Sequence, residues 1–214
     1  MRVVEMRYLS RWLVLLALTF SSVTANASWD EARNAVEQAS AKMMKVLEDE
    51  ALKAPEKNEQ LISEIEAILN PVVDFDYVSK RVMGKYYNRV DDKQQQIFST
   101  VFKDTMVRTY AKSLTGFDIV SYKVAPEGPP SPDADKQVVS VHIFSAKGDQ
   151  YTLVYYMLKG DGGWKLVNVL VDGINLRLNF KNQFSDMVSR TNGDVSQVIA
   201  DWKAAVAGSD SKDS

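Results

Sequence analysis

The sequence predicts an α+β fold in which a four-stranded antiparallel sheet packs against several helices. Apolar residues recur at three- and four-residue steps before Gly116, alternate as in strands from Phe117 to Val171, and return to helical spacing at Leu176. The connections between successive strands are short or of medium length, as in an antiparallel meander. With 45% hydrophobic residues, 10 Gly and 6 Pro among 214 residues, the composition is that of a globular protein.

The N-terminal 27 residues have the pattern of an export signal. Three arginines precede the apolar run 12–20, and Ala25-Asn26-Ala27 follows as a cleavage motif. The apolar run is shorter than the roughly 20 residues that span a bilayer. We therefore expect cleavage after Ala27, a single domain over residues 28–207, and a disordered polar tail over residues 208–214.

Helical spacing dominates the first half of the expected domain. Ser28 and Glu31 have the spacing of a capping box, which predicts a helix that begins at Ser28 and ends near Leu52. Asp74 and Asp91 or Asp92 are candidate caps for later helices. The predicted helices cover residues 28–52, 61–69, 74–86, 92–114, 176–191 and 195–206.

Four strands are predicted between these helices, at 117–124, 138–145, 151–158 and 164–171. The third and fourth strands carry apolar residues in both alternation phases, so we expect both sheet faces to be covered. Two explanations stay open: helix layers that pack fully on the sheet, or a gap that holds an apolar ligand.

The composition excludes several classes of site. There is no Cys and one His, so zinc ribbons, disulfide frameworks, thiol nucleophiles and multi-histidine metal centres are excluded within one chain. The formal net charge of −2 argues against a dedicated nucleic-acid binder. We expect no metal and no cofactor.

Candidate catalytic residues are few. His142 could serve a hydrolase, but a lone strand histidine is more often structural. Asp74 and Asp76 resemble a carboxylate pair, although Asp74 is explained as a helix cap. No nucleophile elbow, phosphate loop or dinucleotide motif occurs, so we expect a protein that is not an enzyme, with no catalytic residues.

A series of short motifs runs through most of the expected domain. They are 70–75 (NPVVDF), 82–87 (VMGKYY), 94–98 (QQQIF), 102–110, 163–169 (GWKLVNV), 172–175 (DGIN) and 179–184 (NFKNQF). In order and spacing these motifs resemble the MlaC family, also called the toluene-tolerance family. At three positions the chain differs from the usual family residue: Asn168 for Asp, Asn175 for Ser and Lys181 for Arg.

The resemblance implies a monomeric periplasmic carrier that holds phospholipid acyl chains in an apolar cavity between sheet and helices. It also implies two partners: an inner-membrane ABC transporter complex with a hexameric lipid-binding ring, and an outer-membrane lipoprotein–porin complex. The carrier would move phospholipid between them and so maintain outer-membrane lipid asymmetry and solvent tolerance.

The expected lipid-binding residues are apolar side chains of the strands and of the helices that face them. Methionine and aromatic side chains suit a pocket that accepts chains of varied length. They are Val139, Val141, Ile143, Leu153, Tyr155, Met157, Val167 and Val169 from strands, with Val82, Met83, Phe102 and Met106 from helices.

Two alternatives stay open beside the carrier. The first is a binding module of the same architecture for another apolar ligand or a protein partner. The second is a hydrolase that acts through His142. A further question concerns a set of cations at helical spacing, which could face partners or headgroups or simply solvent: Lys80, Arg81, Lys85, Arg89, Arg177 and Lys181.

Overall fold

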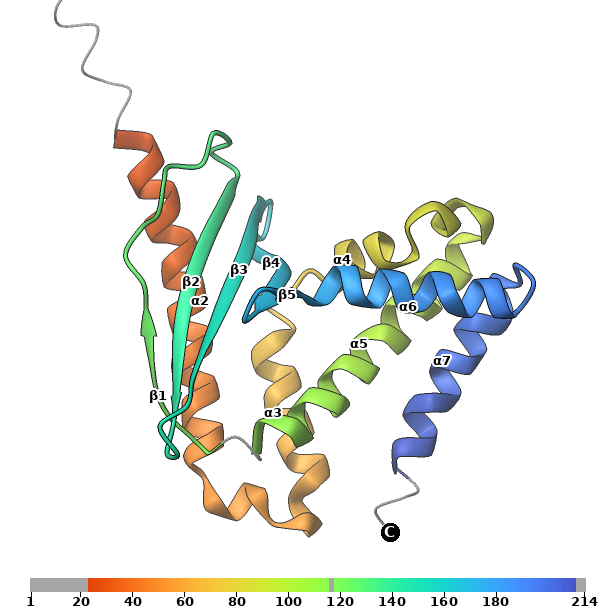
Figure 1. Ribbon diagram of the computed structural model, residues 1–214, viewed down its shortest axis with the longest axis horizontal. Coiled ribbons are helices and arrows are strands. Elements are labelled where there is room, and N and C mark those ends of the chain that lie inside the picture. Colours follow the sequence, from red (N-terminus) through yellow and green to blue (C-terminus); the bar gives the residue numbers. More distant parts are fainter. Residues whose placement is uncertain (1–22, 116–117, 211–214) are drawn as a thin grey trace, which may run out of the picture.

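A computed structural model describes residues 23–115 and 118–210, which form a half built around a sheet and a half built of helices (Figure 1). The α+β prediction is confirmed. The helices are α2 (Val23–Glu48), α3 (Asn58–Leu69), α4 (Phe75–Met83), α5 (Asp92–Thr115), α6 (Leu176–Arg190) and α7 (Val195–Asp210), with 3-10 helices at Glu50–Lys53, Pro55–Lys57 and Gly84–Arg89. The strands are β1 (Ile119–Val124), β2 (Lys136–Ser145), β3 (Gln150–Gly160), β4 (Gly163–Val171) and β5 (Ile174–Asn175).

The sheet has five strands rather than the predicted four. The strands follow sequence order from β1 to β5, and each pair is antiparallel. The four predicted strands are all present, and β5 is the addition. Because β5 has two residues, it is too short to show an alternating pattern.

Two segments are tied to the edge of β4. The β5 residues Ile174 and Asn175 pair with Val171 and Leu170. Residues 72–74 run alongside at Leu166, whose N–H donates to Val72 O (2.7 Å) and whose carbonyl accepts from Asp74 N (3.0 Å). The connection between α3 and α4 is therefore an extension of the sheet, which joins the two halves.

Side-chain caps fix the starts of α4, α5 and α6. Asp74 Oδ1 accepts from Tyr77 N at 2.8 Å ahead of α4, and Asp91 Oδ1 accepts from Gln94 N at 2.7 Å ahead of α5. Asn175 Oδ1 accepts from Leu178 N at 3.0 Å ahead of α6. The predicted cap at Asp74 is confirmed, and Asp91 rather than Asp92 caps α5.

The predicted helix start at Ser28 is wrong. Helix α2 already begins at Val23, so Ser28 lies within it. The Ser28 hydroxyl donates instead to Ala134 O (2.5 Å) and accepts from Gln137 Nε2 (3.2 Å). Residues 1–22 of the expected signal and residues 211–214 of the expected tail lie outside the described residues, and α7 continues through residues 208–210.

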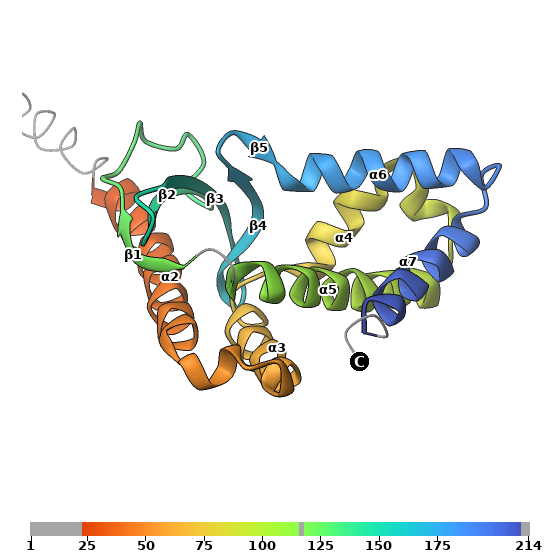
Figure 2. The ribbon, with the colours of Figure 1, turned by 60° about the horizontal axis from the view of Figure 1, so that its bottom comes forward.

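Helices cover one face of the sheet, and the expectation that both faces are covered is wrong. Helix α2 lies along β1, β2 and β4, and the sheet curves beside it (Figure 2). On the opposite face Val138 and Tyr156 pair directly, with 44% and 39% of their surface exposed. Isolated apolar residues are common on protein surfaces, so this face does not require a second layer.

The helical half has an aromatic core of its own. Phe98 of α5 contacts Phe184 of α6 edge to face at 4.9 Å and Trp202 of α7 at 5.4 Å between ring centroids. Val82 and Met83 of α4 belong to the same cluster. This core fixes α4, α5, α6 and α7 relative to one another.

Candidate functional site

The helix-facing side of the sheet has a fully covered part under α2. Ala32 and Val36 pack against a set of buried strand residues. Because these residues have almost no exposed surface, their apolar area is already buried by protein, as in an ordinary core. They are Val139, Val141, Met157 and Trp164.

Polar contacts hold α2 in place over the sheet. Trp29 Nε1 donates to Val138 O at 3.1 Å, and Trp164 Nε1 donates to Glu31 Oε2 at 3.1 Å. Glu31 also accepts from Lys159 Nζ at 2.6 Å, and this bond lowers the pKa of the Glu31 carboxyl. These contacts fix the N-terminal part of α2, at Trp29 and Glu31, against β2, β3 and β4.

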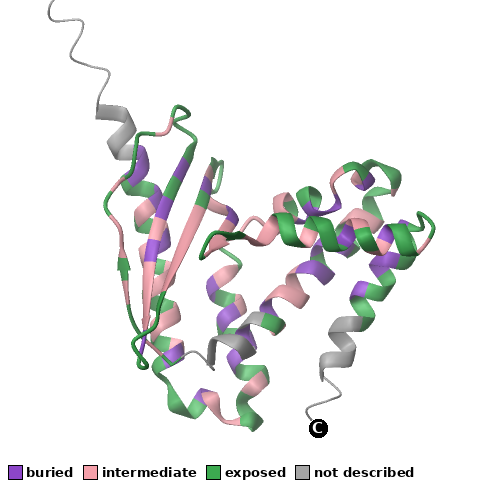
Figure 3. Ribbon diagram, in the orientation of Figure 1, coloured by how far each residue is buried: buried purple, intermediate pink, exposed green. Residues whose placement is uncertain are grey.

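Beside this covered part, apolar residues on the same side are only half-buried. Register places Leu153 opposite Val141, Tyr155 opposite Val139 and Val169 opposite Tyr155, so their side chains share one face. The half-buried members are Ile143, Leu153, Tyr155, Leu166 and Val169. Figure 3 shows this change from buried to intermediate along β2 and β3.

Tyr155 combines two properties. Its surface is incompletely covered by neighbours, yet burial raises the pKa of its hydroxyl well above the ordinary value. Within the described residues, this hydroxyl forms no hydrogen bond. The side chain therefore lies deep in the molecule without a polar partner.

A break in register explains one residue that the sequence reasoning missed. The β3–β4 pairing shifts between Tyr156 and Met157, so Tyr155 faces Val169 whereas Met157 faces Leu166. Leu166 and Val169 therefore share the helix-facing side although they are three residues apart. Val167, predicted with Val169, is buried at this shift, and its carbonyl accepts from Arg177 Nη1 at 3.2 Å.

The predicted helix residues lie in a different cluster from the predicted strand residues. Val82, Met83 and Phe102 are buried in the aromatic core of the helical half, and the half-buried Met106 packs against it. Ile143, Leu153 and Tyr155 belong to the cluster under α2. The predicted strand residues and the predicted helix residues therefore lie in two separate clusters.

A third cluster joins α2, α3 and α5. Leu61, Ile65 and Val107 are buried in it. Its partly exposed members were not predicted as site residues, although the helical stripes contain several of them: Met43, Val46, Leu69 and Phe75.

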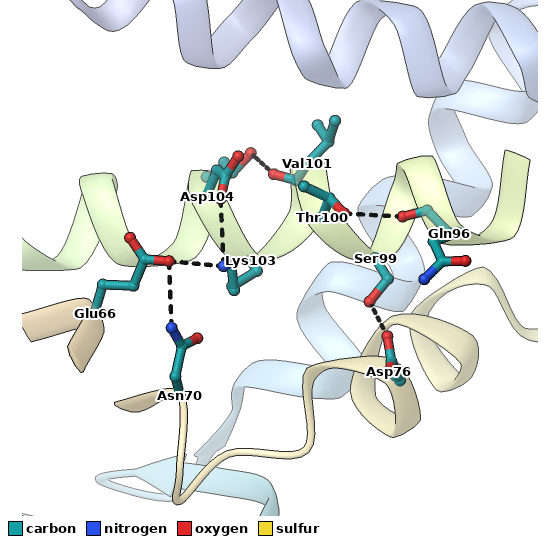
Figure 4. Close-up of polar contacts among 10 residues, drawn as sticks. Glu66, Asn70, Asp76, Gln96, Ser99, Thr100, Val101, Lys103 and Asp104 are labelled. Carbon is teal, nitrogen blue, oxygen red and sulfur yellow. Dashed lines mark hydrogen bonds and ion pairs between the residues drawn. The ribbon is translucent and has the colours of Figure 1, made fainter. Parts of the chain in front are cut away.

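A polar hollow of about 420 Å³ lies where α4, α5 and β4 meet. Its side chains are engaged with one another: Ser99 Oγ donates to Asp76 Oδ1 at 2.5 Å, and Lys103 Nζ lies 2.7 Å from Glu66 Oε1 (Figure 4). Lys165 Nζ donates to the carbonyl of Pro71. These contacts connect α3, α4, α5 and the sheet, and each of Asp76, Lys103 and Lys165 has a hydrogen-bond partner within the protein.

The surroundings of His142 do not form a catalytic triad. Its Nδ1, on β2, lies 3.3 Å from Thr152 Oγ1 and 3.4 Å from Gln150 Nε2, both on β3.

In the described stretches, no three acidic or histidine side chains gather as metal ligands would. One buried polar atom, Asn168 Oδ1, has no hydrogen-bond partner. Among the described helices, none has both the length and the apolar character to cross a membrane.

Comparison with known proteins gives consistent matches. The family model described as MlaC protein matches residues 37–204. The toluene tolerance protein ttg2D of Pseudomonas putida is 32% identical over 141 residues, which are 65% of this chain and 65% of that relative. The intermembrane phospholipid transport system binding protein MlaC of Haemophilus influenzae is 24% identical over 174 residues, which are 78% of this chain and 81% of that protein.

A solved structure has the same fold. It is the phospholipid-binding protein from Ralstonia solanacearum, determined in complex with a phospholipid. The superposition has a TM-score of 0.72 at 24% identity and covers 83% of this chain and 99% of that one. The family model spans most of the chain, from α2 to α7, and the protein therefore belongs to the MlaC family.

Proposed function

We propose that the protein is a periplasmic phospholipid carrier whose acyl-chain site is the half-buried part of the helix-facing sheet. The observation that carries this proposal is that Leu153 and Tyr155, on the helix-facing side of the sheet, are only half-buried. Apolar side chains on the inner side of a well-packed sheet are normally covered. An incomplete cover over a deep, unpaired tyrosine is what an interior ligand site requires.

The energetics favour a long-chain ligand for such a surface. Burying a CH₂ group is worth about 0.8 kcal/mol, so two acyl chains of about 14 groups each represent about 20 kcal/mol. A carrier that removes a lipid from a bilayer must replace nearly all of that. Because a buried unpaired charge would be costly, the walls must be apolar, as Ile143, Leu153 and Leu166 are.

Within this proposal the twelve predicted residues have three roles. The half-buried Ile143, Leu153, Tyr155 and Val169 contact the acyl chains, and the fully buried strand residues Val139, Val141, Met157 and Val167 support these walls from behind. The helix residues belong to the core of the helical half and support the site only through the fold: Val82, Met83, Phe102 and Met106. The headgroup end stays near solvent, so selectivity among headgroups is weak.

The relatives support the transport role. One is named as the binding protein of an intermembrane phospholipid transport system, and the fold neighbour was solved with a phospholipid. The proposed role needs no chemistry, in line with the lack of catalytic partners around His142. We propose delivery between an inner-membrane ABC transporter complex and an outer-membrane lipoprotein–porin complex by a monomer that begins at Ser28.

Solvent extraction of the purified protein followed by mass spectrometry tests the cargo. Phospholipid at about one molecule per chain is the expected result. A protein that is empty after expression in the periplasm, or that carries another apolar compound, contradicts the proposal. A His142→Ala variant that loses membrane-barrier function at normal protein level would favour the hydrolase instead.

A further inference from the structure

Six cations lie on three segments that adjoin one another, here together called the basic face: Lys80 and Arg81 of α4, Lys85 and Arg89 of the following 3-10 helix, and Arg177 and Lys181 of α6. Helices α4 and α6 lie side by side (Figure 1). Arg81 and Arg177 approach the same ring, Tyr77, at 5.0 and 6.0 Å. Lys181 Cε comes so close to Gly84 that a Cβ there would lie 3.3 Å away.

The basic face is not neutralised by the protein itself. Within the described residues none of the six cations forms an ion pair, whereas Lys103 and Lys159 elsewhere pair with Glu66 and Glu31. Asp76 of α4 and Asp172, two residues before β5, accept hydrogen bonds from Ser99 and from the backbone N–H of Thr152. Since the whole chain has a formal net charge of −2, this concentration of positive charge is local.

Tyrosine rings lie among these cations. Lys80 Nζ is 5.0 Å from the Tyr87 ring, and Lys85 Nζ and Arg89 Cζ are each 5.1 Å from the Tyr86 ring. Cation–π contacts of this kind hold a charge at the surface without neutralising it. Tyrosines beside Lys and Arg are also typical of the headgroup level of a membrane.

Two large aliphatic side chains stand exposed beside the basic face. Ile174 of β5 and Leu178 of α6 have 57% and 51% of their surface exposed. Leu178 directly follows Arg177 in the first turn of α6. Exposed aliphatics next to cations are the pattern of a surface that rests on lipid, with the apolar groups between headgroups and the cations on phosphates.

We propose that the basic face, with Ile174 and Leu178, docks onto the headgroup layer of a bilayer that contains anionic phospholipid. An acidic protein would match the charge alone, whereas the exposed aliphatics and the tyrosines favour lipid. The inference concerns the outside of the molecule and goes beyond the cargo site. Docking would bring the carrier to the surface from which lipid is taken or to which it is delivered.

Flotation of the purified protein with vesicles tests this proposal. Two kinds of vesicle are compared: phosphatidylcholine with about 30% phosphatidylglycerol, which gives a negative surface potential, and pure phosphatidylcholine. We expect binding to the anionic vesicles that weakens as NaCl is raised from about 50 to 300 mM. One Lys or Arg near an anionic leaflet strengthens partition about fivefold, so Arg81→Glu with Lys85→Glu should weaken it by more than about tenfold.

Matched variants separate charge, apolar contact and cargo. Lys42→Glu with Lys147→Glu makes the same change of net charge on exposed residues of α2 and the β2–β3 turn, and should bind as the parent does. Leu178→Ser should weaken binding, whereas Val120→Ser, equally exposed on β1, should not. Phospholipid extracted from each variant should be unchanged, because these residues lie outside the proposed acyl-chain site.

Equal binding to both vesicle types, no binding to either, or equal loss in the Lys42/Lys147 variant would overturn the docking proposal. So would capture of an acidic protein by the basic face with no vesicle binding. None of these results depends on whether the extracted protein contains phospholipid, so docking and carriage can fail separately.

Discussion

Tyr155 lies directly opposite Val139 in the β2–β3 pair, yet Val139 has 0% of its surface exposed under α2 while Tyr155 is only half-buried. The two side chains share one face of the sheet, so the helix layer ends between them. A covered core and an incompletely covered apolar wall thus meet within a single cross-strand pair.

Leu153→Glu is expected to abolish cargo while the protein still folds. The half-buried Leu153 faces the helices, and a carboxylate there would face acyl chains without a partner. Co-purifying phospholipid, measured by mass spectrometry against protein, should fall by about tenfold or more. Val154→Glu, one residue along on the opposite face, is the matched control and should keep its lipid; equal loss in both variants would contradict the assignment of faces.

Tyr155→Phe should remove part of the alkaline sensitivity of folding. Burial raises the pKa of Tyr155 in the folded state, whereas in the unfolded chain the hydroxyl ionises near its ordinary value of about 10. The stability linked to this group is therefore present below pH about 10 and is lost as pH rises above it. The urea midpoints at about pH 8 and about pH 11, roughly two units below and one unit above that value, should differ less in the variant than in the parent. Tyr156→Phe, on the exposed face, should keep the parental difference.

Asp74→Ala should destabilise the protein by about 1 kcal/mol through loss of the α4 cap. Asp74 accepts from Tyr77 N, and its own N–H bonds to Leu166 O, so the side chain is positioned by the sheet edge. Asp74→Asn should restore most of the stability, because asparagine caps equally well. The free energy of unfolding in urea gives the measurement, and an Asn variant as unstable as the Ala variant would refute the capping role.

Glu66→Gln should make stability less dependent on acidic pH. The hydrogen bond from Lys103 lowers the pKa of Glu66, against a smaller opposing effect of burial. The stabilisation is therefore present above the unfolded value of about 4.3 and is lost as pH falls below it. The thermal midpoints of parent and variant should differ at pH 7 and converge near pH 3, which is about one unit below the pKa of the glutamate in the unfolded chain. Glu64→Gln, exposed on the same helix, should not show this convergence.

Most of the fold could be predicted from the sequence because its signals are local. The change of hydrophobic period located the helices and four strands, and Asp74 and Asp91 marked helix starts through their own side-chain bonds. The Ser28 motif misled for a physical reason: a helix can continue through a capping sequence when tertiary bonds, here to Ala134 and Gln137, use the hydroxyl.

The candidate site was less predictable because it depends on contacts between distant segments. The sequence-based selection placed Val139, Val141, Leu153 and Tyr155 in one set, and the strand register puts them on one face. It could not reveal the register shift at Tyr156, which brings Leu166 to the helix-facing side. Nor could it show that Val82 and Phe102, apolar and on helices, belong to the aromatic core of α4–α7.

The contacts of Ser28 have a practical consequence for handling the protein. The residue expected to begin the exported chain is bonded to the loop before β2 through Ala134 and Gln137. A substitution or label at Ser28 itself, or at the neighbouring Trp29, whose indole donates to Val138 O, would disturb the contacts between α2 and the sheet. Labels for tracking the molecule between membranes are better attached after α7, leaving the first turn over the sheet intact.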